Sequence, residues 1–371
     1  MTARRSLLTL LVFSALTVAL LWLPSVDTIA CDGGFDSLRA RVISVDSSSL
    51  ERNGLVDYGT EYLTVEMLEG PAKGKRFPAE NELRAQPDLD KRFSPGDIAV
   101  ISWPRAEASP GETLVARDHW RLGWAAALFA AFVALLVLFG GWTGAKAIVS
   151  FVFSCLAVWK ILVPMCLAGW NAAWTSFFTV TVLTAVIVTL VAGVTRRGFA
   201  AFAGTMLGVA VSLSLAAAFA AAMHVTGTTM PYVQTLVFSG CQDLDLVNIF
   251  SGAVILASSG AVMDLAMDIA TGVEEVHRHN PALGMRELFA SGLRIGRAVV
   301  GTMTTTLLLA YSGGYLTLLM VFAAQGTPPV DFLNSTLVSA ELVKTLVGSF
   351  GLVLVAPFTA LVSAVMYKGA P

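Results

Sequence analysis

The chain contains a series of apolar segments that are each long enough to cross a lipid bilayer, and this feature restricts its fold more than any other. The segments cover about residues 6–23, 122–139, 147–167, 173–194, 199–223, 247–270, 299–324 and 342–366. A helix needs about 20 mainly apolar residues to span the hydrocarbon core, where every backbone polar group must be bonded internally. The sequence therefore predicts an α-helical polytopic membrane protein with about eight transmembrane helices. The mean hydropathy of +0.72 agrees with this class.

One region between the first two apolar segments has the composition of a soluble domain. Short runs of alternating apolar and polar residues occur near 39–45, 63–67 and 97–102, separated by turn-forming pairs such as Gly70-Pro71 and Pro95-Gly96. Such runs are typical of half-buried strands. We predict an N-terminal transmembrane anchor at 1–24, an extracytoplasmic β-rich barrel or sandwich at 25–118, and a helical membrane domain of about seven spans at 119–371. Whether the N-terminal segment is cleaved as a signal peptide stays open.

The uneven distribution of lysine and arginine among the loops predicts the orientation. One set of loops and termini carries Arg4, Arg5, Lys146, Arg196, Arg197, Arg278, Arg286, Arg294, Arg297 and Lys368. The short loops on the opposite side, at 169–172, 224–246 and 325–339, carry no lysine or arginine. By the positive-inside rule both termini are cytoplasmic and residues 25–118 lie outside. Cys31 and Cys241 then share the oxidising side, and their pairing is left open.

The stretch 247–276 begins as an apolar span and ends in acidic residues. At about 100° per residue, an arc of roughly 80° holds small residues followed by acids. This face consists of Ala253, Ala257, Gly260, Asp264, Asp268, Thr271 and Glu275. Small residues allow a neighbouring helix to approach closely, and an acid at membrane depth faces a partner or a water-filled cavity. We expect Asp264 to face the bundle interior and to form, with Asp268, a cation or proton path.

Thr302 and Thr306, which are neighbours on a helical face of the 299–324 span, are further candidates for this path. Glu274 and Glu275 are weaker candidates because they fall beyond the expected membrane boundary. Two structural alternatives stay open. The acids pair with Arg294 and Arg297 across the following hairpin, and the threonines bond back to carbonyls of their own helix. A separate stripe of small residues at 200–220, spaced by four, predicts close helix packing without chemistry.

Motifs of catalysis and cofactor binding are absent from the sequence. No phosphate-binding loop and no His-Glu-x-x-His metal motif occurs, and the residues before Asp264 and Ser312 lack the glycines of intramembrane proteases. The formal net charge of −2 argues against a nucleic-acid-binding surface. We predict no enzyme activity, no catalytic residue and no cofactor, while a bound metal stays unknown.

Several short stretches together resemble the YibE/F family of bacterial multi-span membrane proteins. The matching residues lie at 40–43, 58–59, 141–146, 259–264 with 274–275, 304–311 and 346–349. The resemblance implies a helical protein of the bacterial plasma (inner) membrane with an outer N-terminal domain, and it supplies no catalytic residues.

Two functions from different classes are compatible with these features. The first is a permease or transporter of an unidentified small molecule or ion, using the acids of 247–276. The second is a membrane-anchored scaffold whose outer β-domain assembles with envelope proteins. The expected partners are thus the lipid bilayer and either a substrate or envelope proteins, with homo-oligomers left open and nucleic acid excluded.

Overall fold

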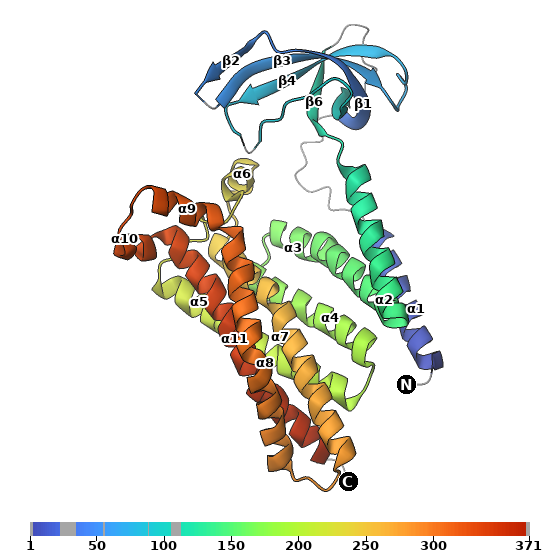
Figure 1. Ribbon diagram of the computed structural model, residues 1–371, viewed down its shortest axis with the longest axis vertical. Coiled ribbons are helices and arrows are strands. Elements are labelled where there is room, and N and C mark those ends of the chain that lie inside the picture. The colour runs from blue at the N-terminus through green and yellow to red at the C-terminus, as the bar shows by residue number, and fades with distance from the viewer. Residues whose placement is uncertain (1–2, 23–34, 55, 88, 105–112, 369–371) are drawn as a thin grey trace. The chain divides into compact units, whose positions relative to one another are not determined.

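The computed structural model describes residues 3–22, 35–54, 56–87, 89–104 and 113–368 (Figure 1). The chain divides into two compact units, one of Ile29–Leu135 and the other of Met1–Thr28 with Leu136–Pro371. The first unit contains the strands, and the second contains most of the helices.

Strands in the described part of the first unit form one closed sheet. They are β1 (Phe35–Asp46), β2 (Leu50–Asn53), β3 (Val56–Met67), β4 (Arg76–Arg84), β5 (Ile98–Pro104) and β6 (Leu114–His119). β1 pairs with β3 and β5, β3 pairs with β4, and β6 joins β4 to β5. β4 and β6 run parallel, whereas the other pairs are antiparallel. Apart from the short β2, this is the five-stranded Greek-key barrel topology known as the OB fold. The predicted β-rich domain is confirmed, in its barrel form.

The barrel interior is apolar because inward and outward side chains alternate along each strand. Leu63, Val65 and Met67 of β3 point inward with Ala79 of β4 and Ile101 of β5. Their side chains form the core of the first unit.

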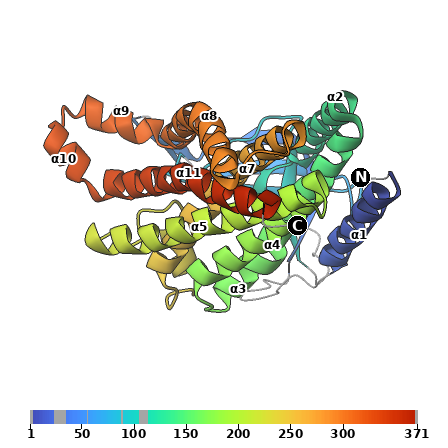
Figure 2. The same ribbon diagram turned by 90° about the horizontal axis from the view of Figure 1, so that it is seen from below.

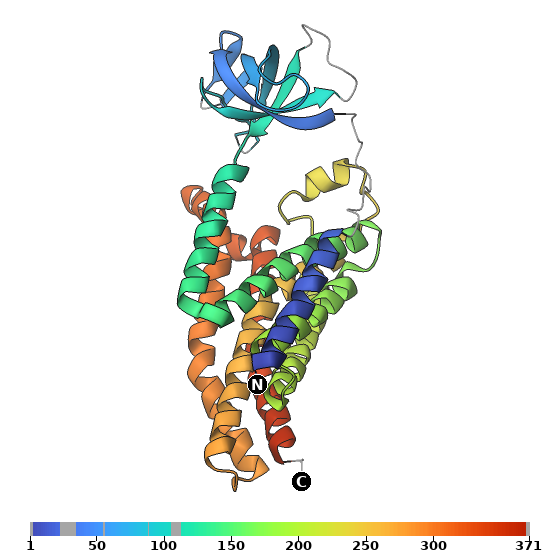
Figure 3. The same ribbon diagram turned by 90° about the vertical axis from the view of Figure 1, so that its right-hand side faces the viewer.

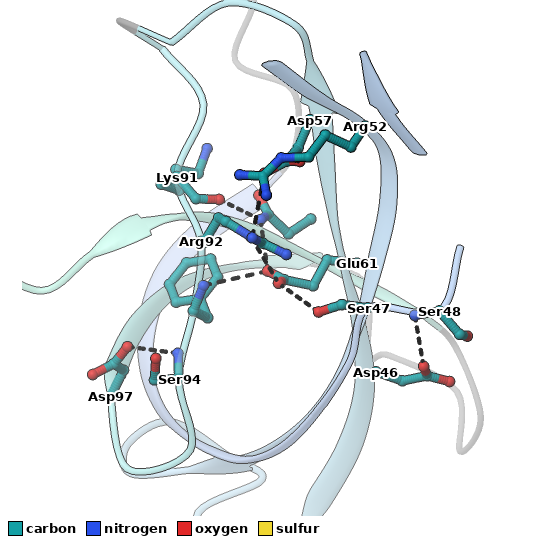
Figure 4. Close-up of polar contacts among 12 residues, drawn as sticks. Asp46, Ser47, Ser48, Arg52, Asp57, Glu61, Lys91, Arg92, Ser94 and Asp97 are labelled. Carbon is teal, nitrogen blue, oxygen red and sulfur yellow. Dashed lines mark hydrogen bonds and ion pairs between the residues drawn. The ribbon is translucent and has the colours of Figure 1, made fainter. Parts of the chain in front are cut away.

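One charged residue, Glu61, shares the inward direction of these apolar side chains and is only 1% exposed. Its carboxylate accepts hydrogen bonds from Ser47 Oγ at 3.1 Å, Asn81 Nδ2 at 3.1 Å and the Phe93 backbone N–H at 3.3 Å (Figure 4). Asn81 Nδ2 also donates to the Lys91 carbonyl at 2.6 Å. The buried carboxylate therefore fixes the segment between β4 and β5 onto the barrel, and its hydrogen bonds offset its desolvation.

Described helices lie in each of the eight apolar segments of the sequence. They are α1 (Ala3–Trp22), α2 (Leu122–Ala157), the π-helix η1 (Val158–Leu162), α3 (Val163–Leu167), α4 (Ala172–Ala192), α5 (Arg196–Ala222), α6 (Val233–Phe238), α7 (Leu246–His279), α8 (Met285–Gly314), α9 (Leu316–Ala324), α10 (Pro329–Asn334) and α11 (Thr336–Lys368). Within the described ranges, five helical stretches are long and apolar enough to span a membrane on their own. The number becomes six if the pair α8 and α9, bent by 65°, forms one span (Figure 2). The chain is thus a helical membrane protein, and the total of eight spans stays a prediction.

The difference in count has three sources. In α1 only the shorter apolar stretch Thr9–Trp22 is found, α8 and α9 are bent apart, and two expected spans form one helical stretch, Leu122–Leu167. At 1.5 Å per residue this stretch is about 69 Å long, more than twice the hydrocarbon thickness. Gly141 interrupts it with φ 52° and ψ −125°, a conformation that favours glycine. The chain turns sharply there (Figure 3), and Gly144 lies so close to the Leu136 carbonyl that a Cβ atom would collide with it.

The centre of the second unit is formed by α5, α7 and α11, which pack against one another. The predicted small-residue stripe of α5 is buried along its length, at Ala200, Gly204, Gly208, Ser212, Ala216 and Ala220. A Cβ atom at Gly204 would collide with Thr359 of α11, and one at Gly351 of α11 would collide with Ser212. The stripe therefore packs closely against α11, as predicted. Cys31 lies outside the described residues, and so does any pairing with Cys241.

Candidate functional site

Helix α7, which carries the candidate acids, is held by neighbours on three sides. Its N-terminus is capped by Asp245, whose carboxylate accepts hydrogen bonds from the backbone N–H groups of Val247 and Asn248 at 3.1 and 3.0 Å. The helix packs against α4, α5, α8 and α11 (Figures 1 and 2). Its buried face includes Ile255, Val262 and Ile269, each 0% exposed.

The small and acidic face of α7 lies opposite this core, and the expectation that Asp264 faces the bundle interior is wrong. Ala253, Ala257, Gly260, Asp264, Asp268, Thr271 and Glu275 are all exposed. Apart from the adjoining backbone of α7 itself, no atom of the described residues lies within 4 Å of the position that a Cβ of Gly260 would take. The physical reason is that branched apolar residues on the other faces bury more surface against α5 and α11 than this face does.

Asp264 and Asp268 have neither a hydrogen-bond nor an ion-pair partner in the described part of the chain. Their helix neighbours Met263 and Met267 pack with Val188 and Ala192, at the end of α4. This contact places Asp264 level with the last turns of α4, about 6 Å along the axis from Asp268. The pair therefore lies near the predicted cytoplasmic membrane boundary, and Asp264 is the one nearer the middle of the predicted span.

Ion pairing with the following hairpin does not occur among the described residues. Arg294 Nη2 instead donates to Ser291 Oγ at 3.1 Å, and Arg297 has no ion pair with either carboxylate within the same ranges. Two like charges four residues apart on one helix repel each other. The structure thus shows two acids that the protein leaves uncompensated.

The structure does not link Thr302 and Thr306 to these acids. Both threonines are exposed on α8, and their hydroxyls donate to carbonyls of their own helix. Thr302 Oγ1 bonds to the Val299 carbonyl at 2.9 Å, and Thr306 Oγ1 bonds to the Thr302 carbonyl at 2.9 Å. The structural alternative for the threonines is therefore the observed one.

Glu274 and Glu275 have structural partners. Glu274 of α7 forms an ion pair with Arg197 of α5 at 3.2 Å and accepts a hydrogen bond from the Tyr367 hydroxyl of α11 at 3.0 Å. Glu275 pairs with Arg278 on its own helix and approaches His279 Nδ1 at 3.3 Å. These contacts explain both residues without a role in transport.

An open groove of about 550 Å³ runs beside the exposed face of α7. One wall is formed by the end of α2 and η1, including Trp159; the second is formed by α4, including Thr184; and α7 contributes Ala257 and Gly260. Its volume falls within the usual range for small-molecule sites. Asp264 follows Gly260 by one helical turn on the same exposed face.

Two features of this groove escaped the sequence prediction. The first is η1, because a π-helical turn has no clear sequence signal, although such turns are frequent at functional sites. The second is Thr184, which is 0% exposed and whose Oγ1 lacks a hydrogen-bond partner among the described residues. On the same helix Thr175, Thr179 and Thr181 donate to carbonyls four residues earlier. No feature of the sequence distinguishes Thr184 from them.

The chemistry available to this face is binding of a positive charge or a proton by carboxylates. No group of three or more His, Cys, Asp or Glu residues within the described ranges is arranged to hold a metal ion.

The family model described as YibE/F-like protein matches residues 128–369 of the chain. No curated protein and no solved structure matches the chain. The matched region begins within α2 and includes α7 with both candidate acids.

Proposed function

The chain belongs to the YibE/F-like family, and from this premise we propose that it is a permease-like membrane protein. Asp264 and Asp268 carry the charge that binds a cation or relays protons during transport. The proposal extends beyond family membership, which by itself names neither an activity nor a substrate.

One observation carries the proposal: these two carboxylates are exposed, lie one helical turn apart and have no ion-pair partner in the described part of the chain. The sequence predicts that they lie near the membrane boundary. A charged residue inside a membrane is costly, by about 2.5–3.5 kcal/mol at the centre of a span on insertion scales. Two other acids of α7 do have ion pairs: Glu274 pairs with Arg197 of α5, and Glu275 pairs with Arg278 of α7 itself. We infer that the two acids without partners are retained for a ligand.

A proton or a monovalent cation bound by the pair removes the repulsion between the carboxylates and neutralises one of their charges. The singly charged pair is less costly at membrane depth than the doubly charged one. Ligand binding therefore changes the depth at which this face of α7 is stable, and this difference couples binding to movement of the substrate.

The test is a metabolite and metal profile of cells that lack or overproduce the protein. We expect overproduction to shift the amount of one class of compound, and the double variant Asp264→Asn/Asp268→Asn, produced at the same level, to abolish the shift. A shift that persists in the double variant contradicts the acidic path, and an unchanged profile on overproduction of the natural protein contradicts transport.

The alternative function is that of a scaffold, and one feature of the barrel favours it. Tyr58 and Tyr62 are 40% and 49% exposed on the outward face of β3, where aromatic side chains suit a binding partner. In this case Tyr62→Ala abolishes co-purification of envelope proteins with the full-length chain, and the double aspartate variant does not.

A further inference from the structure

We propose that the groove between η1, α4 and α7 binds hydrophobic ammonium compounds, apolar molecules with one positive charge and at least one N–H group. The inference rests on the proposed function and names its substrate class. It follows from the shape of the groove, one unpaired hydroxyl and the adjacent acids.

The shape of the groove suits a compact apolar molecule. The lining is mainly aliphatic and aromatic, and Trp159, which is 66% exposed, provides a broad apolar wall. Ala257 and Gly260 make the α7 side shallow, so that a ligand approaches the helix backbone closely. A polar ligand would gain little from these walls, because apolar burial is the main source of affinity in such a pocket.

The hydroxyl of Thr184 supplies a site for an N–H donor. Thr184 belongs to the α4 wall, and its Oγ1 lacks a hydrogen-bond partner among the described residues. Because the residue is 0% exposed, a ligand reaches this oxygen only after the lining side chains around it shift. A buried hydroxyl without a partner costs about 1–3 kcal/mol, and a ligand that bonds to it removes this cost. A tertiary, secondary or primary ammonium group provides the donor.

The acids supply the preference for positive charge. Asp264 lies about 6 Å along α7 from Gly260, one turn beyond the groove, with Asp268 a further turn away. No cation of the described chain compensates either carboxylate. At this distance in a medium of low dielectric constant, two carboxylates attract a cation and repel an anion.

The experiment compares three ligands with one apolar cage and different charges: 1-aminoadamantane, 1-adamantanol and 1-adamantanecarboxylate. Equilibrium binding of the labelled amine to purified full-length protein is measured at neutral pH, with the other two as competitors. We expect the amine to bind at least tenfold more tightly than the alcohol, and the carboxylate not to compete. Equal binding of all three overturns the proposal, since it identifies a lipid-facing crevice without charge recognition.

Two glycines give a matched pair of variants. Both Gly260 and Gly301 are exposed helical residues. Outside the adjoining backbone of their own helices, no atom of the described chain lies within 4 Å of an added Cβ, but only Gly260 lines the groove. We expect Gly260→Leu to fill the groove and weaken amine binding at least tenfold, and Gly301→Leu to leave it unchanged. Equal effects of the two variants contradict the assignment of the site.

Two further variants separate charge from hydrogen bonding. Asp264→Asn removes the preference for the amine over the alcohol, whereas Thr184→Val weakens amine binding several-fold without lowering the melting temperature. Thr184→Val with unchanged affinity contradicts the hydroxyl contact.

The two proposals can fail separately. If Asp264→Asn/Asp268→Asn abolishes the profile shift but the amine is not preferred, the substrate class is wrong and the transport proposal stands. If the amine binds as expected but the profile shift survives, the groove stands and the transport proposal fails.

Discussion

Glu274 joins three helices through its contacts with Arg197 of α5 and Tyr367 of α11. Glu274→Gln keeps the volume but leaves the Arg197 guanidinium without its ion pair at a half-buried position. We expect the unfolding free energy to fall by about 1–3 kcal/mol, because an unsatisfied charged group is costly. The measurement is thermal unfolding of the purified full-length protein.

The matched control for this prediction is Glu275→Gln, because Glu275 bonds only to residues of its own helix. We expect this exposed pair to contribute at most about 1 kcal/mol. If both variants are equally stable, the three-helix contact does not hold the bundle together.

Glu69 of the first unit gives a pH-dependent contribution to stability. Hydrogen bonds from Arg39 Nε at 2.9 Å and the Arg39 backbone N–H at 2.8 Å lower the pKa of Glu69 below its ordinary value of 4.5. Because the pKa is depressed in the folded state, the stabilisation is present above pH 4.5 and is lost as the pH falls through the folded pKa. Urea unfolding of the 25–121 fragment at several pH values should show Glu69→Gln less stable at pH 7, with the difference shrinking below pH 4.5. A difference that grows on acidification contradicts this sign.

At the residue scale, the sequence predicted local contacts better than distant ones. The hydroxyls of Thr302 and Thr306 bond to carbonyls of their own helix, which is one of the arrangements that the sequence left open. Glu274 pairs with Arg197, which precedes it by a whole helix hairpin, and no spacing rule identifies such a partner. The burial of Glu61 was not predicted, although the sequence carries a signal for it. Glu61 lies in the same alternating pattern as the inward residues Leu63, Val65 and Met67.

At the element scale, the turn within α2 depends on two glycines with different roles. Gly144 lies against the Leu136 carbonyl, whereas Gly140 has no atom of the described chain within 4 Å of an added Cβ. We expect Gly144→Ala to lower stability by about 1–3 kcal/mol, as overpacking does, and Gly140→Ala to have little effect. Apparent melting temperatures of the two variants test this. A larger loss at Gly140 would mean that the turn is arranged differently.

The small-residue stripes of α5 and α7 show what helical periodicity predicts and what it does not. Periodicity identified both stripes, but only that of α5 packs against another helix, because α11 presents Gly351 to it. The stripe of α7 is exposed, since its opposite face carries the bulky residues that build the core. Residues that face lipid and residues that face the bundle core have similar hydrophobicity, so composition alone does not show which face of a helix packs inside the bundle.

At the scale of the whole molecule, the distribution of lysine and arginine predicts that residues 25–118 and the α7–α8 loop lie on opposite sides of the membrane. Single cysteines introduced at Asp90 and Asn280 in a background without the natural cysteines test this. We expect an impermeant thiol reagent added outside intact cells to label position 90 and not position 280. Labelling of both positions from outside contradicts the orientation.

The fold class and the presence of a β-domain were predictable from the sequence, because hydrophobic run length and alternation are local properties. The closure of the barrel was not, since the pairing of β1 with both β3 and β5 joins distant segments. The groove also escaped prediction for this reason: η1, α4 and α7 meet only in the folded chain.

The central claim is that Asp264 acts through its charge in transport. The most direct measurement is the profile shift per molecule of folded, membrane-inserted protein for Asp264→Asn beside Glu275→Gln. Asp264→Asn keeps the side-chain volume and removes the titratable charge. Because Asp264 has no ion pair to lose among the described residues, the variant should fold normally and lose the shift, whereas Glu275→Gln should retain it. A shift of natural size per folded molecule in both variants would contradict the acidic path and leave the scaffold function favoured.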